Sequence, residues 1–308
     1  MAIFNTIDNL PQFKNAVVTI GTFDGVHQGH QRILQEVVRH TREVAGESIV
    51  VTFEPHPRKV LFPGSPVKLL TSLQQKLTLI TATGIEHIVV APFTKEFSEL
   101  SAVEYIRDFL VARFKPESII IGYDHHFGHD RKGNITLLKQ FQDEFGYKIH
   151  EIPAQLVDEA AVSSTKIRAA LLDGNVQEAA TMMNRHYSIS GTVVYGDQLG
   201  RKIGFPTANI KPSEPDQLIP GNGVYAVRVV YKGEVFNGMM NIGYRPTVSG
   251  SDLRIEVNIL DFNEDIYAEE LEILFIQKLR DEKKFDGLDA LKLQLQQDKE
   301  NALAILSK

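Results

Sequence analysis

The sequence predicts an α/β protein of two domains, the first with a mostly parallel sheet covered by helices and the second an antiparallel β-barrel with a terminal helix. A chain of 308 residues, 43% of them hydrophobic, is long enough to bury more than one core. Up to about residue 149, β-branched apolar runs alternate with segments of helical spacing, and after residue 184 short strand-like runs follow one another. The periodicity of the apolar residues thus changes between Met183 and Ser188, which predicts domains at 1–185 and 186–308.

In the first half, strands are expected at AVVTI, SIVVTF, HIVVAPF and SIIIG, with helices between them. The segment after residue 30 places Ile33, Leu34, Val37 and Val38 on one stripe, which predicts a helix packed on a sheet. Repeated crossovers of this kind give a Rossmann-like fold, in which ligands bind beyond the carboxyl ends of the strands. Site residues are therefore expected in strand-to-helix loops.

In the second half, turn-forming residues separate the runs YSISGTVVYG, GVYAVRVVY, EVFNGMMNIG, LRIEVNIL and ELEILFI, which predicts a compact antiparallel barrel. The closing segment has Leu288, Leu291 and Leu295 at helical spacing, so a terminal amphipathic helix is expected. Asp286 is placed to cap its N-terminus.

The composition excludes several classes of function. There is no cysteine, so disulfides, thiolate metal sites and cysteine nucleophiles are excluded. The N-terminus lacks a basic segment followed by an apolar run, so we expect a cytoplasmic protein that neither is exported nor spans a membrane. A net charge of -6 gives no general basic field for nucleic acid, so any phosphate ligand needs a local site. A monomer or weak homo-oligomer is expected.

The segment GTFDGVHQGH, Gly21 to His30, joins a predicted strand to a predicted helix. Its glycines permit tight turns and close ligand approach, and the helix start directs N–H groups and a positive dipole end at an anion. His27 and His30, three residues apart, are expected to point to the same side and donate to phosphate. The alternative is an ordinary glycine turn. The residues of this loop that are assigned to a bound phosphate group are Gly21, Phe23, Asp24, Gly25 and Gly29.

This loop resembles the H-x-G-H signature of the nucleotidyltransferase superfamily, in the form found in bacterial bifunctional riboflavin kinase/FAD synthetases. VTFEPHP, residues 51–57, resembles that family's T-F-x-P-H-P segment, which implies that His56 borders the flavin or ATP. VSSTKIR, residues 162–168, is similar to I-S-S-T-x-I-R and implies ATP-phosphate contacts from Ser164, Thr165 and Arg168. An ordinary helix N-cap with a solvated arginine is the alternative.

Residues 121–134 hold three histidines and two aspartates, so a metal site is one interpretation. Against it, neighbouring His125 and His126 point in opposite directions on an extended chain. The segment resembles the family's G-x-D-F-x-F-G-x-x-R-x-G pattern, which implies an adenylate or flavin contact at Asp124 and a flavin contact at Phe127. His125 and His126 replace the usual Phe and Arg. If that arginine contacts phosphate in relatives, binding here is expected to be weaker or pH-dependent.

GTVVYGDQLGRKIGFPTANI, residues 191–210, is similar along its whole length to the riboflavin kinase signature. Thr207 and Asn209 alternate onto one side of a strand, where both oxygens can face Mg²⁺. The alternative is a Gly-rich hairpin followed by an Asn turn. The residues expected to wrap the ATP tail, in place of a Walker loop, are Gly196, Gly200, Arg201 and Gly204.

In LRIEVNILDF, Glu256 projects to the face opposite Ile255 and Val257 and resembles the family's general base. The alternative is an exposed strand glutamate. Asn258 stands where relatives often carry His. Ala268 replaces a frequent Gly and disfavours positive φ, so that turn is expected to differ from relatives. The stretch KLRDEKKF implies that Arg280 lies near the flavin or its phosphate.

The resemblance covers Val17 to about Asp298 and implies two Mg²⁺-dependent activities that use ATP as co-substrate. Riboflavin is phosphorylated to FMN in the second domain, and FMN is adenylylated to FAD in the first. Two alternatives stay open: an enzyme with one activity, the adenylyltransferase being the one put at risk by His125 and His126, and a flavin sensor or carrier without turnover. The presence of His27, His30 and Glu256 favours an enzyme.

Overall fold

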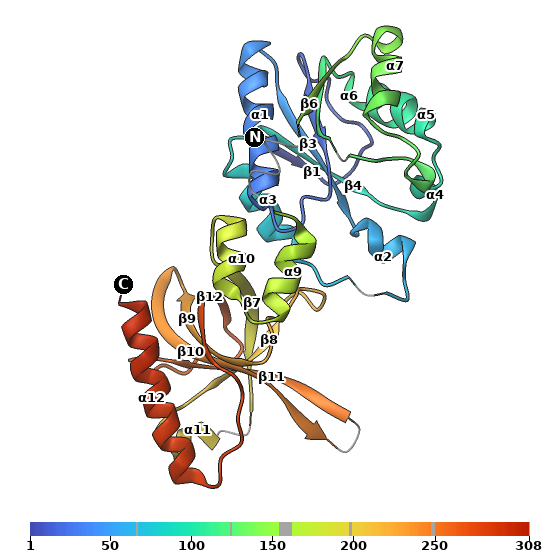
Figure 1. Ribbon diagram of the computed structural model, residues 1–308. Coiled ribbons are helices and arrows are strands. Elements are labelled where there is room, and N and C mark those ends of the chain that lie inside the picture. Colours follow the sequence, from blue (N-terminus) through green and yellow to red (C-terminus); the bar gives the residue numbers. More distant parts are fainter. Residues whose placement is uncertain (66, 124, 154–161, 197–198, 248–249, 308) are drawn as a thin grey trace. The chain divides into compact units, whose positions relative to one another are not determined.

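The computed structural model describes residues 1–65, 67–123, 125–153, 162–196, 199–247 and 250–307 (Figure 1). The chain divides into two compact units, Met1–Ser164 and Thr165–Lys308. This division groups the helices after residue 164 with the second unit, and the division into functional domains at residue 185 stays a prediction.

The first unit contains a parallel sheet of six strands in the order β1-β4-β3-β2-β5-β6. The four predicted strands are present, and the sheet adds two edge strands that were not predicted, β1 at the N-terminus and β6. Their bounds are β1 Ala2–Phe4, β2 Val17–Ile20, β3 Ser48–Glu54, β4 His87–Pro92, β5 Ser118–Gly122 and β6 Lys148–Ile152. The middle strands are buried along their length, which explains why they are continuous apolar runs.

Helices cover both faces of this sheet (Figure 1). One core cluster joins α1 and α3 to the sheet through residues such as Leu34, Val37 and Ile80, and another holds Phe109 and Leu138. The sheet is therefore fully enclosed, as a parallel sheet requires. The helices are α1 Gln28–Glu43, α2 Pro57–Leu61, α3 Leu73–Thr81, α4 Lys95–Ser98, α5 Ala102–Glu104, the π-helix η1 Tyr105–Val111, α6 Ala112–Phe114, the 3₁₀ helix η2 His129–Arg131 and α7 Ile135–Phe145.

The strand order reverses between β2 and β5. From β2 the chain moves to β3 and β4 on one side, whereas β5 and β6 lie on the other side. Parallel sheets bind ligands at such a reversal, just beyond the carboxyl ends of the strands. The loop from Gly21 follows β2 and the segment from Tyr123 follows β5, so both candidate segments begin at this place.

The second unit is built on a closed antiparallel barrel in the order β10-β11-β8-β7-β12-β9, as predicted. Alternate residues of the strands, for example Ile189, Ile273 and Phe275, are fully buried. The strands are β7 Tyr187–Val194, β8 Ala208–Pro212, β9 Gly223–Tyr231, β10 Glu234–Thr247, β11 Gly250–Ile259 and β12 Glu270–Arg280.

Helices α9 Ser164–Leu172, α10 Val176–Met183, α11 Leu199–Lys202 and α12 Leu288–Leu306 complete this part of the chain. The long α12 packs on β9 and β10 (Figure 1), and Ala302 and Leu306 join Phe205 and Met239 in one core cluster. The predicted terminal helix is confirmed.

Two expectations for the second unit are wrong. Helix α12 begins at Leu288 with Gly287 as its N-cap and has no side-chain cap, so Asp286 lies one residue too early to serve. Ala268 adopts a φ of 64°, so the alanine accepts the left-handed conformation that we expected it to avoid. Backbone bonds hold it there, since its N–H donates to the Val193 carbonyl and Glu269 N–H donates to Ile266.

Candidate functional sites

The loop after β2 has an unusual backbone. Phe23, Gly25 and Val26 have φ values of 48°, 82° and 37°, although only glycine adopts this region without strain. At Gly25 an added Cβ would also lie 2.8 Å from a Leu70 methyl carbon. Strain of this kind persists only where the surroundings fix the conformation, and it is common where a loop must present its backbone to a ligand.

His27 is the N-cap of α1, and its Nδ1 accepts a 3.4 Å hydrogen bond from the His30 N–H. The two imidazole rings stack with centroids 3.7 Å apart and planes 19° apart, as expected from their spacing. The Phe23 ring meets His30 edge-on at 5.2 Å. The histidine pair thus lies at the start of the helix, where the dipole favours a bound anion.

A hydrogen-bond network holds this loop in place. The buried Asp24 carboxylate accepts from the N–H groups of Leu70 and Thr71 at 2.9 and 3.2 Å, and the Gly25 N–H donates to the Thr71 hydroxyl at 3.2 Å. Ser164 Oγ donates to the Asp24 carbonyl at 3.0 Å. The Ser164 segment and the histidine loop, far apart in sequence, therefore meet in the first unit. Asp24 organises the loop, and its predicted contact with ATP stays a prediction.

The other predicted residues of the first unit lie in several environments. His56 caps α2, accepting from the Arg58 N–H at 3.2 Å, and is 9% exposed. Phe127 is buried, stacks on Tyr105 at 4.9 Å and pairs with Gly133. Its flavin contact stays a prediction. His125 is half-buried and His126 exposed, while Asp124 lies outside the described residues.

Gly21 begins the loop, donating its N–H to the Val51 carbonyl at 3.0 Å, and Gly29 is buried in the first turn of α1. Thr165 and Arg168 lie on α9 and belong to the second compact unit. Their predicted contacts with ATP stay predictions.

In the second unit, Glu256 meets the Pro-Thr-Ala-Asn segment. Thr207 Oγ1 donates to a Glu256 carboxylate oxygen at 3.3 Å, and Glu256 is the direct partner of Asn209 in the pairing of β11 with β8. Residues that pair directly across an antiparallel ladder project to the same face. The predicted hydroxyl, amide and carboxylate therefore lie together on one side of the barrel wall.

Glycines make room for this group. A Cβ at Gly196 would overlap the Asn209 amide, and one at Gly200 would overlap the Phe205 carbonyl. Gly204 has a φ of 86° and open space beside it. Gly196 and Gly200 thus permit close packing around the segment, and Gly204 permits its turn.

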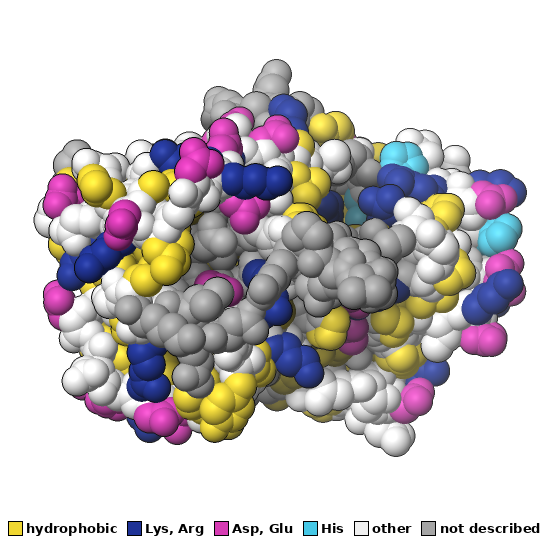
Figure 2. Space-filling model, turned by 90° about the horizontal axis from the view of Figure 1, so that it is seen from below, with side chains coloured by type: hydrophobic (Ala, Val, Ile, Leu, Met, Phe, Trp, Pro, Cys, Tyr) yellow, Lys and Arg dark blue, Asp and Glu magenta, His cyan; other side chains and the backbone are white. Residues whose placement is uncertain are grey.

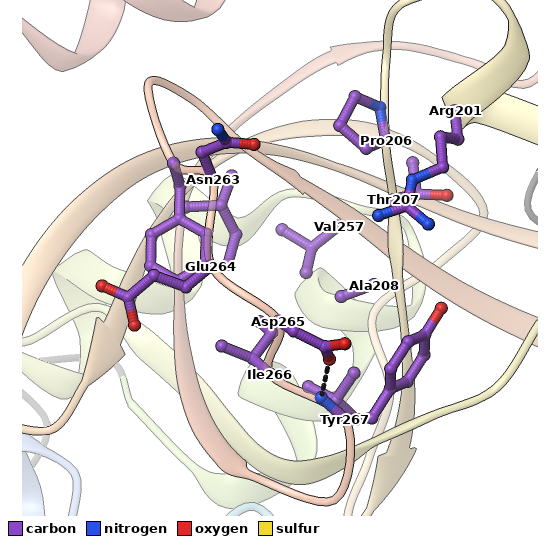
Figure 3. Close-up of a pocket in the computed structure, with 13 residues that line it drawn as sticks. Arg201, Pro206, Thr207, Ala208, Val257, Asn263, Glu264, Asp265, Ile266 and Tyr267 are labelled. Carbon is purple, nitrogen blue, oxygen red and sulfur yellow. Dashed lines mark hydrogen bonds between the residues drawn. The ribbon is translucent and has the colours of Figure 1, made fainter.

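A cavity of about 400 Å³ opens beside Thr207 (Figure 3). Its floor includes Val257 and Ala208, and Figure 3 shows Arg201, Pro206 and Thr207 on one side of it. Residues 262–267 complete the lining, and Figure 3 shows Asn263 and Glu264 opposite Arg201. A 3.2 Å bond from the Tyr267 N–H to Asp265 stiffens this loop. Val257 faces this cavity, so its neighbour Glu256 projects to the other face of the strand. Thr207 links the cavity to Glu256, because it lines the cavity and also donates a hydrogen bond to the Glu256 carboxylate.

Sequence reasoning missed the loop of residues 262–267 as part of the site. A run of turn-forming residues, DFNED, was the available signal, but it indicates only a loop. The exposed Tyr195 ring stacks on Tyr267 with centroids 4.0 Å apart, which adds an aromatic pair next to the cavity.

Asn258 and Arg280 have partners inside the protein. Asn258, buried, donates from its amide to the Pro206 carbonyl at 2.6 Å, so it fixes the segment that precedes β8 and carries Thr207. Arg280 binds the carboxylate of Asp298 through Nε at 3.0 Å and Nη2 at 2.7 Å, and Asp298 is 1% exposed. Arg280 thereby ties β12 to α12, and its flavin contact stays a prediction.

Among the described residues, no group of three or more His, Asp or Glu side chains is arranged to hold a metal ion. None of the helices in that part of the chain combines the length and the apolar character that a membrane span requires. On the face in Figure 2, Lys and Arg side chains are interspersed with Asp and Glu rather than gathered into one basic patch.

Comparison with known proteins matches a protein family to each half of the chain. The FAD synthetase family model matches residues 10–166, and the riboflavin kinase family model matches residues 183–306. Fold and matches together define a two-domain transferase of flavin nucleotide synthesis. The chain belongs to the bifunctional riboflavin kinase/FMN adenylyltransferase family.

Curated relatives support this family membership over nearly the whole length of the chain. The bifunctional riboflavin kinase/FMN adenylyltransferase of Listeria monocytogenes is 39% identical, with 96% of this chain and 93% of the relative covered. The protein of the same description from Escherichia coli is 36% identical, with 97% and 96% covered. A solved structure from Streptococcus pneumoniae, described as a "Macrolide-efflux Protein", matches with a TM-score of 0.89 and 31% identity over 98% of both chains. That description applies to the pneumococcal protein.

Proposed function

We propose that this chain phosphorylates riboflavin to FMN in the barrel and adenylylates FMN to FAD in the α/β unit, each with ATP. The observation that carries the barrel half of the proposal is the 3.3 Å bond between Thr207 and Glu256 at the edge of the cavity. The observation that carries the other half is the stacked pair His27 and His30 at the start of α1, where the sheet order reverses.

In the kinase reaction, ATP occupies the cavity lined by Arg201 and Thr207, and riboflavin approaches from the Glu256 side. The Glu256 carboxylate accepts the proton of the ribityl 5′-hydroxyl while that oxygen forms a bond to the γ-phosphorus. The bond from the γ-phosphorus to the β,γ-bridging oxygen breaks, and ADP leaves. Gly196, Gly200 and Gly204 give the ATP tail the close backbone approach that this requires.

The donor set of this site fits Mg²⁺. Thr207, just before β8, and Asn209, within it, supply neutral hard oxygens, which suits an ion that takes its other ligands from phosphates and water. When bound, the ion supplies charge neutralisation for the transferred phosphoryl group. The Asn209 side chain is 9% exposed and packed by Gly196, so its orientation is fixed in advance.

In the adenylyltransferase reaction, a phosphate oxygen of FMN attacks the α-phosphorus of ATP, and the bond to pyrophosphate breaks. His27 and His30 donate hydrogen bonds to the phosphate oxygens as charge develops on them, and the α1 N-terminus adds its dipole. Ser164 contacts the backbone of the histidine loop directly, and Thr165 and Arg168 follow it in the sequence. Contacts of FMN or ATP with His56, Asp124 and Phe127 belong to this proposal, as does a riboflavin contact of Arg280.

A cytoplasmic location and a monomeric or weakly associating state complete the proposal. One experiment tests its central part. Purified protein is supplied with riboflavin, ATP and Mg²⁺, and the flavins are separated by chromatography over time. We expect FMN to appear first and FAD to follow, and FMN supplied directly should give FAD without the first step. FMN without any FAD would refute the dual function and leave a riboflavin kinase.

A further inference from the structure

Lys76, on α3, is a buried cation that the proposed chemistry does not use. Its side chain is 7% exposed. Its Nζ lies 3.3 Å from the carbonyl oxygen of Thr22 and 3.4 Å from that of Phe53. Thr22 belongs to the histidine loop after β2, and Phe53 lies at the end of β3, three residues before His56. One ammonium group therefore donates both to the histidine loop and to the end of β3, the strand that leads to His56.

The Thr22 carbonyl is held from two sides. It also accepts a 3.1 Å hydrogen bond from the Thr52 hydroxyl on β3. The next residue along the chain, Phe23, begins the strained backbone that ends at the His27 N-cap. The direction in which this short loop leaves β2 therefore depends on the donors that fix the Thr22 carbonyl, and Lys76 is the charged one.

Stability alone does not explain a lysine here. Removing an ammonium group from water is costly, and an apolar side chain of similar length would fill the same space without that cost. The charged groups that face Lys76 are Glu54 at the end of β3 and Asp24 in the loop, and burial lowers the pKa of Lys76 more than these carboxylates raise it. The protein thus retains a destabilising charge where the parallel strands end.

We propose that Lys76 is a positioning residue for adenylyl transfer, which fixes the histidine loop relative to the His56 segment so that FMN and ATP meet in line. The inference rests on the adenylyltransferase function proposed for the first unit. It assigns the lysine to the reaction rather than to folding. Its charge also offsets part of the negative charge that two phosphate substrates bring to this end of the sheet.

The test uses Lys76→Met in the full chain, with both reactions measured on the same preparation. We expect kcat for FAD formation from FMN to fall by about tenfold to a hundredfold, the loss typical of a small misplacement of reactants. FMN formation from riboflavin should stay within twofold, and the thermal midpoint should be unchanged or higher. Lys139→Met, which removes a half-exposed lysine of the same unit, is the matched control and should leave both rates unchanged.

The pH dependence separates positioning from support of the fold. Because burial lowers its pKa, Lys76 loses its charge at a lower pH than an exposed lysine, so FAD formation should fall on the alkaline side. The unfolded chain keeps that proton to higher pH, so the free energy of unfolding should rise over the same window. Lys76→Arg keeps a charge at all these pH values and should lack the alkaline fall.

Several outcomes would overturn the inference. One is a Lys76→Met protein whose FAD formation is within twofold of the parent. Another is a loss of both activities together with a lower thermal midpoint, which would assign Lys76 to the fold. Should Lys76→Met not fold, the pH profiles of the parent and of Lys76→Arg decide, and identical alkaline limbs would refute the inference. A parent protein that makes no FAD would instead refute the proposed function on which it rests.

Discussion

The two units hold their candidate sites in different ways. In the α/β unit the site depends on an irregular loop, in which Phe23 and Val26 adopt positive φ and buried polar groups fix the backbone. In the barrel, Glu256 and Asn209 are placed by the regular pairing of two strands. The comparison teaches that the first site is sensitive to changes in loop backbone and its buried anchors, whereas the second is sensitive to the side chains on one strand face.

The sharpest test of two separate sites is Glu256→Gln. Without a base for the ribityl hydroxyl, kcat for FMN formation should fall by about a thousandfold, within the range typical of general base removal. The conversion of supplied FMN to FAD should be unchanged, measured with the same protein. Loss of both reactions in a folded variant would show that the two units do not work independently.

His30→Ala is the reciprocal change. Removing one donor to the phosphates should lower FAD formation by about a hundredfold to a thousandfold. FMN formation from riboflavin should continue at the parent rate, which serves as the internal control. A His30→Ala protein that makes FAD normally would remove the histidine pair from the mechanism.

Asp298→Asn tests how the barrel is held together rather than how it reacts. The change leaves Arg280, 20% exposed, without its carboxylate, and breaking a largely buried pair costs about 3 kcal/mol. Hydrogen exchange should show faster opening of β9 and β12, with the α/β sheet unaffected. Asp289→Asn, an exposed change on the same helix, is the control and should alter neither unit. Equal protection in both variants would contradict the role given to Asp298.

The smallest expected effects come from two glycines with similar backbone angles. Gly25→Ala meets both a φ of 82° and the Leu70 side chain, so it should destabilise the α/β unit by about 2 kcal/mol and slow FAD formation. Gly204→Ala meets a φ of 86° but open space, so a cost of about 1 kcal/mol to the barrel is expected. Urea unfolding compares them, and the reverse order would show that crowding at Gly25 is easily relieved.

Much of the candidate sites followed from local pattern. The spacing of His27 and His30 at a helix start predicts their common direction, and alternation along a strand predicts the common face of Thr207 and Asn209. The two expectations that local pattern got wrong concern Asp286 as a helix cap and Ala268 as a residue that avoids positive φ. A helix start can shift by one residue when a glycine such as Gly287 precedes it, and an alanine takes a left-handed conformation when long-range hydrogen bonds compensate the strain.

The sequence by itself determined the alternation of strands and helices, the change to a barrel, and the chemical groups that we propose to bind phosphate, flavin and Mg²⁺. These properties are set by residues close together in the chain, so periodicity and motif spacing report them. Only the tertiary structure decided that Thr207 binds Glu256, that residues 262–267 complete a cavity, and that Lys76 joins the histidine loop to the end of β3. The hydrogen bonds among these contacts join residues 23 to 54 positions apart, and no local pattern fixes which distant side chains a fold brings within hydrogen-bonding distance.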